Sequence, residues 1–162
     1  MSHLNYFLDT EFYENGKTIE LISIGVVCED GREFYRVESR ADETCKKSDW
    51  LIANVLPHLP PKIDWSWQTK EAIARELSEF FLPGPKPRIW TYYGAYDWVV
   101  VCQLYGAMID LPAHFPKFDM DLKQLSVERG SPCHPKQKGI EHDALADALY
   151  NQKLYSFLGG DR

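Results

Sequence analysis

The sequence predicts an α/β fold in which a mixed sheet is flanked by helices, with core elements in the order βββαβα. Two observations lead to this prediction. The first forty residues hold three segments rich in β-branched and aromatic residues, separated by short turn sequences. Beyond them, amphipathic segments of helical length alternate with one short apolar segment, which is typical of helices packed on a sheet.

The first three strands are predicted over residues 3–12, 19–28 and 33–37. Asn15-Gly16 separates the first two strands, and Asp30-Gly31 separates the second from the third. Both dipeptides readily supply the positive φ angles that tight hairpin turns require. The chain is therefore expected to begin as an antiparallel meander.

Two helices are expected next. Residues 46–55 are predicted to form a short one, which the proline cluster at 57–61 ends. Residues 68–82 are predicted to form a longer amphipathic one. Its apolar residues recur at helical spacing, and they are Ile73, Leu77, Phe80 and Phe81.

The second half of the chain completes the pattern. A fourth strand is predicted over residues 88–93 and an apolar helix over 96–105, followed by a helix that starts at Asp121. Residues 130–139 are expected to form a loop, and 141–158 a closing helix. The residues expected close to one face of that helix are Leu145, Leu149, Gln152 and Tyr155.

Length and composition narrow the possible functions. The chain has 162 residues, 44% of them hydrophobic, so we expect a single domain over residues 1–162. The net charge of −6 argues against a protein that holds a long duplex by charge alone, but it is compatible with metal-binding acids that act on phosphates. The four cysteines are widely spaced, which disfavours a zinc cluster. Because no segment reaches about 18 apolar residues, we expect a cytoplasmic protein with no membrane partner.

Two carboxylates interrupt the first predicted strand. Asp9 and Glu11 follow an apolar run at the point where a core strand should continue. Residues i and i+2 of a strand point to the same face, so these side chains project together, roughly 7 Å apart along the strand. Like charges held this close repel each other and are costly to remove from water. The simplest interpretation is a binding site for a divalent cation.

Two further acids lie among apolar residues. Asp97 follows the fourth predicted strand at the start of a helix, where it could be either a metal ligand or an ordinary N-cap. Asp147 lies among alanine and leucine in the last helix, where an acid without a partner would be unfavourable. Asp143 is one turn earlier on the same face, and we assign it to a favourable interaction with the helix dipole. Asp147 is then the predicted ligand.

In their order and spacing, Asp9-Thr10-Glu11, Asp97, His142 and Asp147 resemble the DEDDh branch of the 3′–5′ exonucleases, which belongs to the RNase H-like superfamily. That family shows D-x-E on its first strand, a third Asp after the fourth strand and H-x-x-x-x-D at the last helix. The segments Asp-Thr-Glu-Phe, Ile-Glu-Leu-Ile-Ser-Ile-Gly, Gly-Ala-Tyr-Asp and His-Asp-Ala-Leu are most similar to those of small bacterial and phage RNase T-like exoribonucleases. The resemblance covers nearly the whole chain and implies an RNase H-like fold.

The resemblance also implies an active site with two Mg²⁺ or Mn²⁺ ions, which oxygen ligands suit. Asp9 would bridge both ions, Glu11 and Asp147 would help hold the ion on the nucleophile side, and Asp97 would support the ion on the leaving-group side. His142 would take the proton from the attacking water. A lone histidine near a helix start is otherwise more often a surface or capping residue.

Phe12, Thr10 and Lys138 are the predicted substrate-binding residues. RNase T-like relatives use residues after D-x-E for the terminal nucleotide, so Phe12 is a candidate for stacking on its base, with core packing as the alternative. The sequence departs here from the familiar D-x-E-T-T-G-L form, so the usual contacts cannot be transferred. Lys138 belongs to the basic loop 129–138, which could either touch substrate phosphates or be simply solvated.

These residues together predict a metal-dependent 3′–5′ exoribonuclease that releases nucleoside 5′-monophosphates from the 3′ end of single-stranded RNA or short oligonucleotides. Two alternatives stay open: an exodeoxyribonuclease, because recognition of the 2′-hydroxyl depends on geometry, and a non-catalytic nucleic-acid-binding module on the same fold. The presence of all four carboxylates and His142 argues against the second. Relatives are often homodimers, and the apolar segment 57–67 could supply the contact, so a homodimer is also expected.

Overall fold

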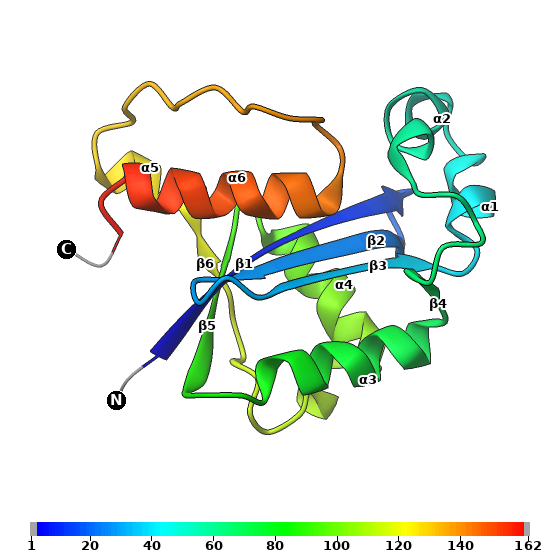
Figure 1. The fold of residues 1–162 in the computed structure, drawn as a ribbon, viewed down its shortest axis with the longest axis horizontal. Helices are drawn as coiled ribbons and strands as arrows, with labels where there is room; N and C mark the ends of the chain where they lie inside the picture. Colours follow the sequence, from blue (N-terminus) through cyan, green and yellow to red (C-terminus); the bar gives the residue numbers. More distant parts are fainter. Residues whose placement is uncertain (1–2, 161–162) are drawn as a thin grey trace.

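The computed structural model describes residues 3–160, in which a six-stranded mixed sheet lies between layers of helices (Figure 1). The strands are ordered β4-β3-β2-β1-β5-β6 across the sheet. Their bounds are β1 His3–Glu14, β2 Ile19–Cys28, β3 Glu33–Glu38, β4 Trp67–Gln68, β5 Lys86–Thr91 and β6 Met120–Asp121. This arrangement confirms the predicted α/β fold with a mixed sheet.

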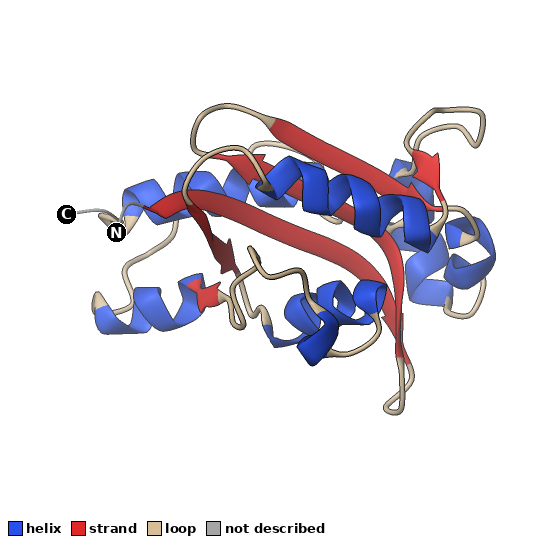
Figure 2. Cartoon of the chain, turned by 90° about the horizontal axis from the view of Figure 1, so that it is seen from below, coloured by secondary structure: helices blue, strands red, loops and turns tan. Residues whose placement is uncertain are grey.

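Helices cover both faces of the sheet. The α-helices are α1 Ala41–Cys45, α2 Asp49–Asn54, α3 Lys70–Phe81, α4 Ala95–Tyr105, α5 Leu122–Glu128 and α6 Ala144–Phe157, with two short 3₁₀ helices, η1 Leu56–His58 and η2 Met108–Asp110. α3 and α4 cover the face turned to the viewer in Figure 2, and α6 crosses the opposite face. No helix within residues 3–160 has the length and apolar character needed to cross a membrane.

The strand pairing matches the predicted meander. β1 pairs antiparallel with β2, and β2 pairs antiparallel with β3. β1 also pairs parallel with β5, which brings the carboxyl ends of these two strands to the same edge of the sheet. The β1–β2 register shifts after Glu11, because Glu11 lies opposite Ser23 and Phe12 lies opposite Leu21. A bulge of this kind locally bends a strand pair and is frequent beside active sites.

Close packing positions α6 over the central strands. The buried face of α6 consists of Ala144, Ala148, Asn151, Leu154 and Tyr155. A Cβ atom placed on Gly25 of β2 would lie only 2.3 Å from the carbonyl oxygen of Ala144. The helix can therefore approach the sheet this closely only because position 25 has no side chain and position 144 has a small one. Of the face predicted from Leu145, Leu149, Gln152 and Tyr155, only Tyr155 is buried, and Leu149 is 41% exposed.

Several element ends differ from the predictions for local reasons. Within the helix predicted over 46–55 only α2 is helical, and it starts at Asp49 because the backbone of its N-cap, Ser48, is extended. The short helix α1, over Ala41–Cys45, was not predicted. The strand predicted to end at residue 93 ends at Thr91, and Tyr93 has a positive φ of 57°. α6 begins at Ala144 rather than 141, because His142 has a φ of 64°. The two-residue strands β4 and β6 carry no sequence signal and were not predicted.

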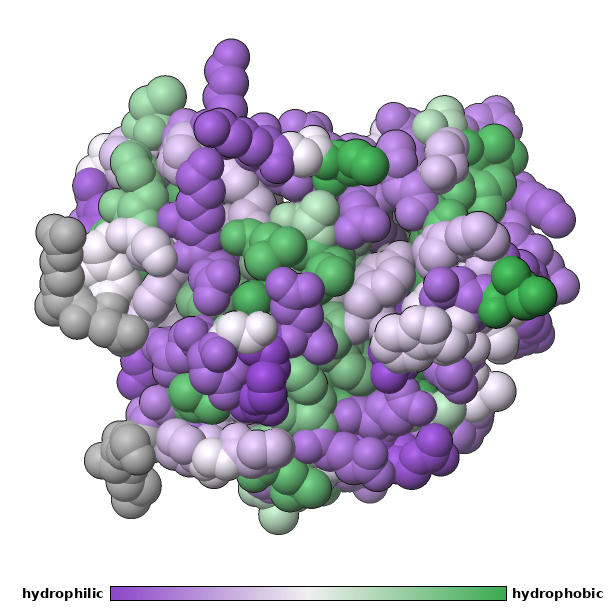
Figure 3. Space-filling view, in the orientation of Figure 1, coloured by the Kyte–Doolittle hydropathy of each residue, from purple (hydrophilic) through white to green (hydrophobic). Residues whose placement is uncertain are grey.

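The surface includes the segment expected to support a dimer. On the face seen in Figure 3, hydrophilic residues predominate and apolar ones are scattered among them. Within the segment 57–67, Ile63 is 97% exposed and Trp65 is 69% exposed. Trp65 is therefore not a core residue, and the guanidinium of Arg36 lies 4.4 Å from its ring centre. The homodimer remains a prediction.

Candidate active site

Three of the predicted site residues, Asp9, His142 and Asp147, line one open cavity beside the middle of β1. The cavity has a volume of about 240 Å³. Residues from β1, from the turn after β5, from the loop before α6 and from α6 itself line it: Asp9, Tyr92, Gln137, Glu141, His142, Asp147, Tyr150 and Asn151. The fold thus places Asp9 beside Asp147 and His142, although more than 130 residues separate them in the chain.

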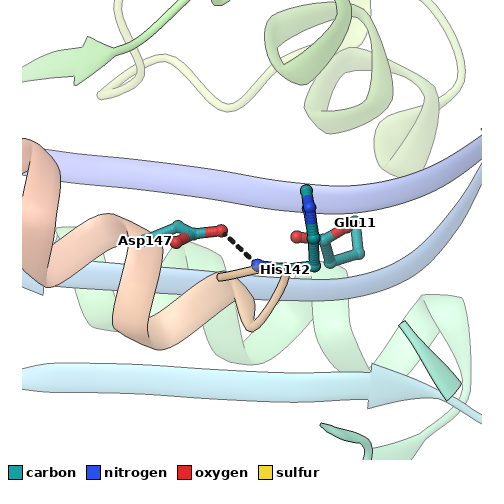
Figure 4. Close-up of side chains that lie close together, drawn as sticks. All are labelled: Glu11, His142 and Asp147. Atoms are coloured by element: carbon teal, nitrogen blue, oxygen red, sulfur yellow. Dashed lines mark hydrogen bonds between the residues drawn. The ribbon is translucent and has the colours of Figure 1, made fainter. Parts of the chain in front are cut away.

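Glu11, His142 and Asp147 form the tightest group. One carboxylate oxygen of each acid and one ring nitrogen of His142 all lie within 4.8 Å of one another (Figure 4). The backbone amide of His142 donates a hydrogen bond of 3.0 Å to Oδ2 of Asp147. The Nε2 group of Gln137 donates to the other oxygen, Oδ1. The irregular backbone before α6 therefore both orients Asp147 and brings the imidazole beside Glu11.

Asp97 approaches the site from the opposite face of the sheet. It lies in the first turn of α4, whose N-cap is Gly94, so it is not the N-cap that the sequence left as an alternative. Its Oδ1 accepts hydrogen bonds from the amide of Thr10, at 2.9 Å, and from the Thr10 hydroxyl, at 2.6 Å. Alternation along β1 therefore gives the D-x-E segment two functions, since Thr10 fixes Asp97 while Asp9 and Glu11 face the cavity side.

Thr10 and Asp143 have different surroundings from those predicted. Thr10 was predicted to bind substrate, and in the structure it is buried and both of its donors point to Asp97. Its contact with substrate remains a prediction. Asp143 is the N-cap of α6, and its carboxylate accepts a 2.8 Å hydrogen bond from the amide of Ala146. The helix-dipole role assigned to Asp143 is thus refined to capping.

The acids raise one another's pKa values. Burial, together with the charges of Asp97 and Glu11, raises the pKa of Asp9 well above its usual value. Burial and repulsion from Asp147 and Asp97 raise the pKa of Glu11 to about 8. These shifts mean that the ionised cluster is unfavourable in the absence of a counter-charge.

Hydrogen bonds partly offset this effect at the other two acids. Burial raises the pKa of Asp97 to about 6, although the two hydrogen bonds from Thr10 act in the opposite direction. Burial also raises the pKa of Asp147, whereas the hydrogen bonds from Gln137 and His142 lower it. Asp97 and Asp147 are therefore the acids whose charged forms the protein itself stabilises best.

The donor set fits divalent cations. None of the four carboxylates forms an ion pair with a lysine or arginine within the part of the chain that the structure describes. Four clustered acids that have no lysine or arginine partner among the described residues offer hard oxygen donors, as Mg²⁺ and Mn²⁺ prefer. The ligand atoms of Glu11 and Asp147 are already close enough to share an ion.

Phe12 and Lys138 flank the carboxylates at two different places. The ring of Phe12 stacks on that of Tyr96, with ring centres 5.7 Å apart and planes inclined by 8°. Phe12 also packs against the main core cluster, as the core-packing alternative expects, and its stacking on a substrate base remains a prediction. Lys138 is exposed and lines a cavity of about 200 Å³. That cavity shares Gln137 and Tyr150 with the active-site cavity.

Some cavity residues were not found from the sequence. Asn151 is one helical turn after Asp147, and its Nδ2 donates a 3.1 Å hydrogen bond to the carbonyl oxygen of Leu8. The sequence could have indicated Asn151, because residues i and i+4 of a helix share a face and Asn151 therefore lies on the face that carries Asp147. Gln137 and Tyr92 gave no such signal, since they lie in irregular segments. The half-exposed Trp50 of α2 contacts the His142 ring edge-on, with ring centres 4.8 Å apart, and was also missed.

Sequence comparison identifies related proteins over nearly the whole chain. A family model described as the 3′–5′ exoribonuclease Rv2179c-like domain matches residues 4–158. The 3′–5′ exoribonuclease Rv2179c of Mycobacterium tuberculosis (strain ATCC 25618 / H37Rv) is 46% identical over 147 residues, which cover 90% of this chain and 87% of that protein. The 3′–5′ exoribonuclease MT2234.1 of strain CDC 1551 / Oshkosh matches to the same extent.

Solved structures show the same fold at low sequence identity. E. coli exonuclease I in complex with a dT13 oligonucleotide superposes with a TM-score of 0.65 and 14% identity, covering 97% of this chain. The match spans 41% of exonuclease I, which is a much longer protein. The Mg²⁺- and Mn²⁺-bound form of S. pombe Pop2p gives a TM-score of 0.56 at 14% identity, covering 97% of this chain and 83% of Pop2p. These likenesses confirm the predicted RNase H-like exonuclease fold.

Proposed function

The chain belongs to the Rv2179c-like 3′–5′ exoribonuclease domain family, and we propose that it removes nucleoside 5′-monophosphates one at a time from the 3′ end of single-stranded RNA or short oligoribonucleotides. The observation that carries this proposal is a group of four mutually repelling carboxylates, of which Asp9 and Asp147 line an open cavity together with His142 and Glu11 lies close to both Asp147 and His142. Among residues 3–160, no lysine or arginine is paired with these acids. A cluster that is electrostatically unfavourable by itself is understandable as a metal site acting on a phosphodiester.

Asp9, Glu11, Asp97 and Asp147 would hold the metal ions. Two bound Mg²⁺ or Mn²⁺ ions would supply an activated water at neutral pH and would stabilise negative charge on the leaving 3′ oxygen. The hydrogen bonds from Thr10 keep Asp97 in place, and those from Gln137 and His142 orient Asp147. The protein thereby fixes both acids before substrate arrives, which reduces the reorganisation needed during the reaction.

His142 would accept the proton of the attacking water. Its ring nitrogen lies within 4.8 Å of a Glu11 oxygen and an Asp147 oxygen, so it borders the space where the water would be held. Its backbone amide is tied to Asp147, while its ring contacts Trp50. The imidazole can therefore turn by its side-chain torsions without disturbing the carboxylate beside it.

The terminal nucleotide would lie against Phe12. The stacked pair of Phe12 and Tyr96 begins immediately after Glu11 and immediately before Asp97, so a base resting there would hold the scissile phosphate near the carboxylates. Lys138 would contribute positive charge from the loop that borders the cavity. Stacking does not distinguish bases by hydrogen bonding, so we expect a broad base preference.

The decisive experiment compares Asp147→Asn with its matched control Asp143→Asn on the same helix. The substrates are a 5′-labelled single-stranded RNA and a DNA of the same sequence, each incubated with Mg²⁺ or with EDTA. We expect the wild type and Asp143→Asn to shorten the RNA from its 3′ end, because asparagine still caps a helix. Asp147→Asn should bind RNA and remain folded but should release no nucleotides.

Three results would contradict the proposal. Full activity of Asp147→Asn would remove Asp147 from the catalytic site. Shortening of the DNA with little action on the RNA would favour the exodeoxyribonuclease alternative. Binding of RNA by the wild type without any shortening in Mg²⁺ would instead indicate a non-catalytic binding module.

A further inference from the structure

Tyr93 combines an unfavourable backbone with an exposed aromatic side chain. It lies between β5 and α4, has a φ of 57° and is 61% exposed. Large residues seldom adopt this left-handed conformation, which is more often found at functional sites than elsewhere. The ring therefore gains little from burial, and its position needs another explanation.

Close packing of Gly94 against Thr91 and Asp119 restrains the turn that carries Tyr93. A Cβ atom on the next residue, Gly94, would lie 1.7 Å from Oγ1 of Thr91 and 2.2 Å from Oδ2 of Asp119. The Thr91 hydroxyl donates a 2.5 Å hydrogen bond to that same Asp119 oxygen. Since Gly94 rests directly on this pair and its carbonyl oxygen accepts the amide of Trp98 at 2.9 Å, the backbone has little room to move. The Tyr93 ring is consequently held at the surface.

The surroundings of this ring connect it to the active site. Tyr93 packs edge-on against Tyr92, with ring centres 4.8 Å apart, and Tyr92 lines the cavity together with Asp9. The Nζ atom of Lys123, from α5, lies 5.8 Å from the centre of the Tyr93 ring. An exposed aromatic ring with an ammonium group beside it is thus in contact with Tyr92, which lines the cavity.

The Tyr93 ring and Phe12 are carried by different elements of the fold. Phe12 lies beyond Glu11 along β1, whereas Tyr92 and Tyr93 follow directly after β5, the strand that pairs with β1. A terminal nucleotide on Phe12 would place its 5′ phosphate at the carboxylates, so the preceding nucleotide would continue toward Tyr93. The two aromatic surfaces would then flank the bond that is cleaved.

We propose that Tyr93 and Lys123 form the binding site for the nucleotide on the 5′ side of the cleaved bond, an inference that rests on the proposed exonuclease function. The base stacks on the Tyr93 ring, and the ammonium group of Lys123 contacts a phosphate of that nucleotide. An aromatic ring and a point charge accept any base, so the site holds the strand without selecting its sequence.

The test compares a substrate that has this nucleotide with one that lacks it. The first is a triribonucleotide, and the second is the p-nitrophenyl ester of thymidine 5′-monophosphate, which carries a nitrophenyl group in place of the 5′-side nucleotide. Tyr93→Asn removes the ring with a residue that tolerates the left-handed backbone, and Tyr93→Phe keeps the ring. We expect Tyr93→Asn to lower the ratio of kcat/KM for the trinucleotide to kcat/KM for the ester by a factor of about 5 to 150, the usual effect of losing one base stack. Tyr93→Phe should keep that ratio within about twofold of the wild type, because the stacking face is retained.

Lys123→Gln gives a second measurement that does not depend on the strained turn. Loss of one phosphate contact should reduce the slope of log affinity against log salt concentration by about 0.7 for a single strand. Binding is measured by the fluorescence anisotropy of a labelled oligoribonucleotide in EDTA, so the result does not depend on turnover. Lys86→Gln, at the other end of β5, and Phe157→Asn, at the end of α6, are matched controls for charge and aromatic exposure.

Equal effects of Tyr93→Asn on both substrates, or an unchanged salt slope in Lys123→Gln, would overturn the inference. If the wild type hydrolysed neither substrate, the proposed function would fail separately. The anisotropy measurement would then still support the site if Tyr93→Asn weakened binding and Phe157→Asn did not, and would overturn it otherwise.

Discussion

Replacing Glu11 by glutamine should make the metal-free protein more stable than the wild type at pH 8, even though the same change removes a metal ligand. The reason lies in the pKa of the Glu11 carboxyl, which burial and the charges of Asp147 and Asp97 raise to about 8. Glutamine has nearly the same shape as the protonated acid and carries no charge, so it fits the same space without repulsion.

The size and sign of this effect follow from the pKa values. The carboxyl titrates near 4.5 in the unfolded chain and near 8 in the folded protein, and this difference corresponds to about 5 kcal/mol. Because the folded-state pKa is the higher one, the folded protein favours the protonated Glu11 carboxyl. The stability that this preference contributes is fully present below pH 4.5, decreases as the pH rises and is lost once the pH has passed 8. The Glu11→Gln variant lacks this dependence. The two proteins should therefore be similarly stable near pH 4.5 and should differ by up to about 5 kcal/mol above pH 8.

Urea unfolding in EDTA, followed by tryptophan fluorescence from pH 4.5 to 9, measures this difference. The two proteins differ in charge only at Glu11, although removal of this charge also lowers the pKa of Asp9, which Glu11 helps to raise. The change in the stability difference with pH therefore reports on the Glu11 charge together with its effect on the neighbouring acids. Added Mg²⁺ should restore stability to the wild type at pH 8 and should have a much smaller effect on Glu11→Gln. A stability difference that does not change with pH would refute the electrostatic reasoning.

Three further substitutions test separate parts of the site. Thr10→Val removes the hydroxyl that donates to Asp97 at 2.6 Å. It should lower kcat by about tenfold or more, since a hydrogen bond to a charged group contributes about 1.5–3 kcal/mol. An unchanged kcat with Mg²⁺ would show that Asp97 does not need this hydrogen bond. Gly25→Ala should destabilise the protein by about 1–3 kcal/mol in thermal or urea unfolding, because the new methyl group meets the Ala144 carbonyl and displaces α6; wild-type stability would contradict this packing. His142→Gln should lower kcat for nucleotide release by about 10²–10⁴ while calorimetry still detects Mg²⁺ binding, and a normal rate would assign proton transfer to another group.

Much of the architecture could be predicted because it depends on neighbouring residues. β2 has the predicted bounds, and the antiparallel pairing of the first three strands follows from the two turn sequences. α3 buries Ile73, Leu77 and Phe81, as their helical spacing predicts. These features rely on backbone preferences and on the periodicity of apolar residues, which a linear sequence displays directly.

The features that were predicted wrongly or missed depend on contacts from distant parts of the chain. α6 was expected to present Leu145 and Leu149 to the core, yet Ala144 and Ala148 are buried instead, because Gly25 of β2 lets the start of the helix approach closely. The backbone of Tyr93 could not be inferred either, because Asp119, which fixes the turn, lies in a separate segment. Spacing along the chain does not encode such distances.

The candidate site also has features that follow from neighbouring residues and features that depend on distant contacts. By itself, the sequence determined that Asp9 and Glu11 share a strand face and that Asp97, His142 and Asp147 are acids or bases in apolar or helix-start surroundings, because side-chain direction follows from local periodicity. Only the tertiary structure decided that Thr10 holds Asp97, that Gln137 holds Asp147 and that Tyr93 and Lys123 meet beside the cavity. Those relations join residues from different strands, helices and loops, and their distances are set by how the layers pack against the sheet.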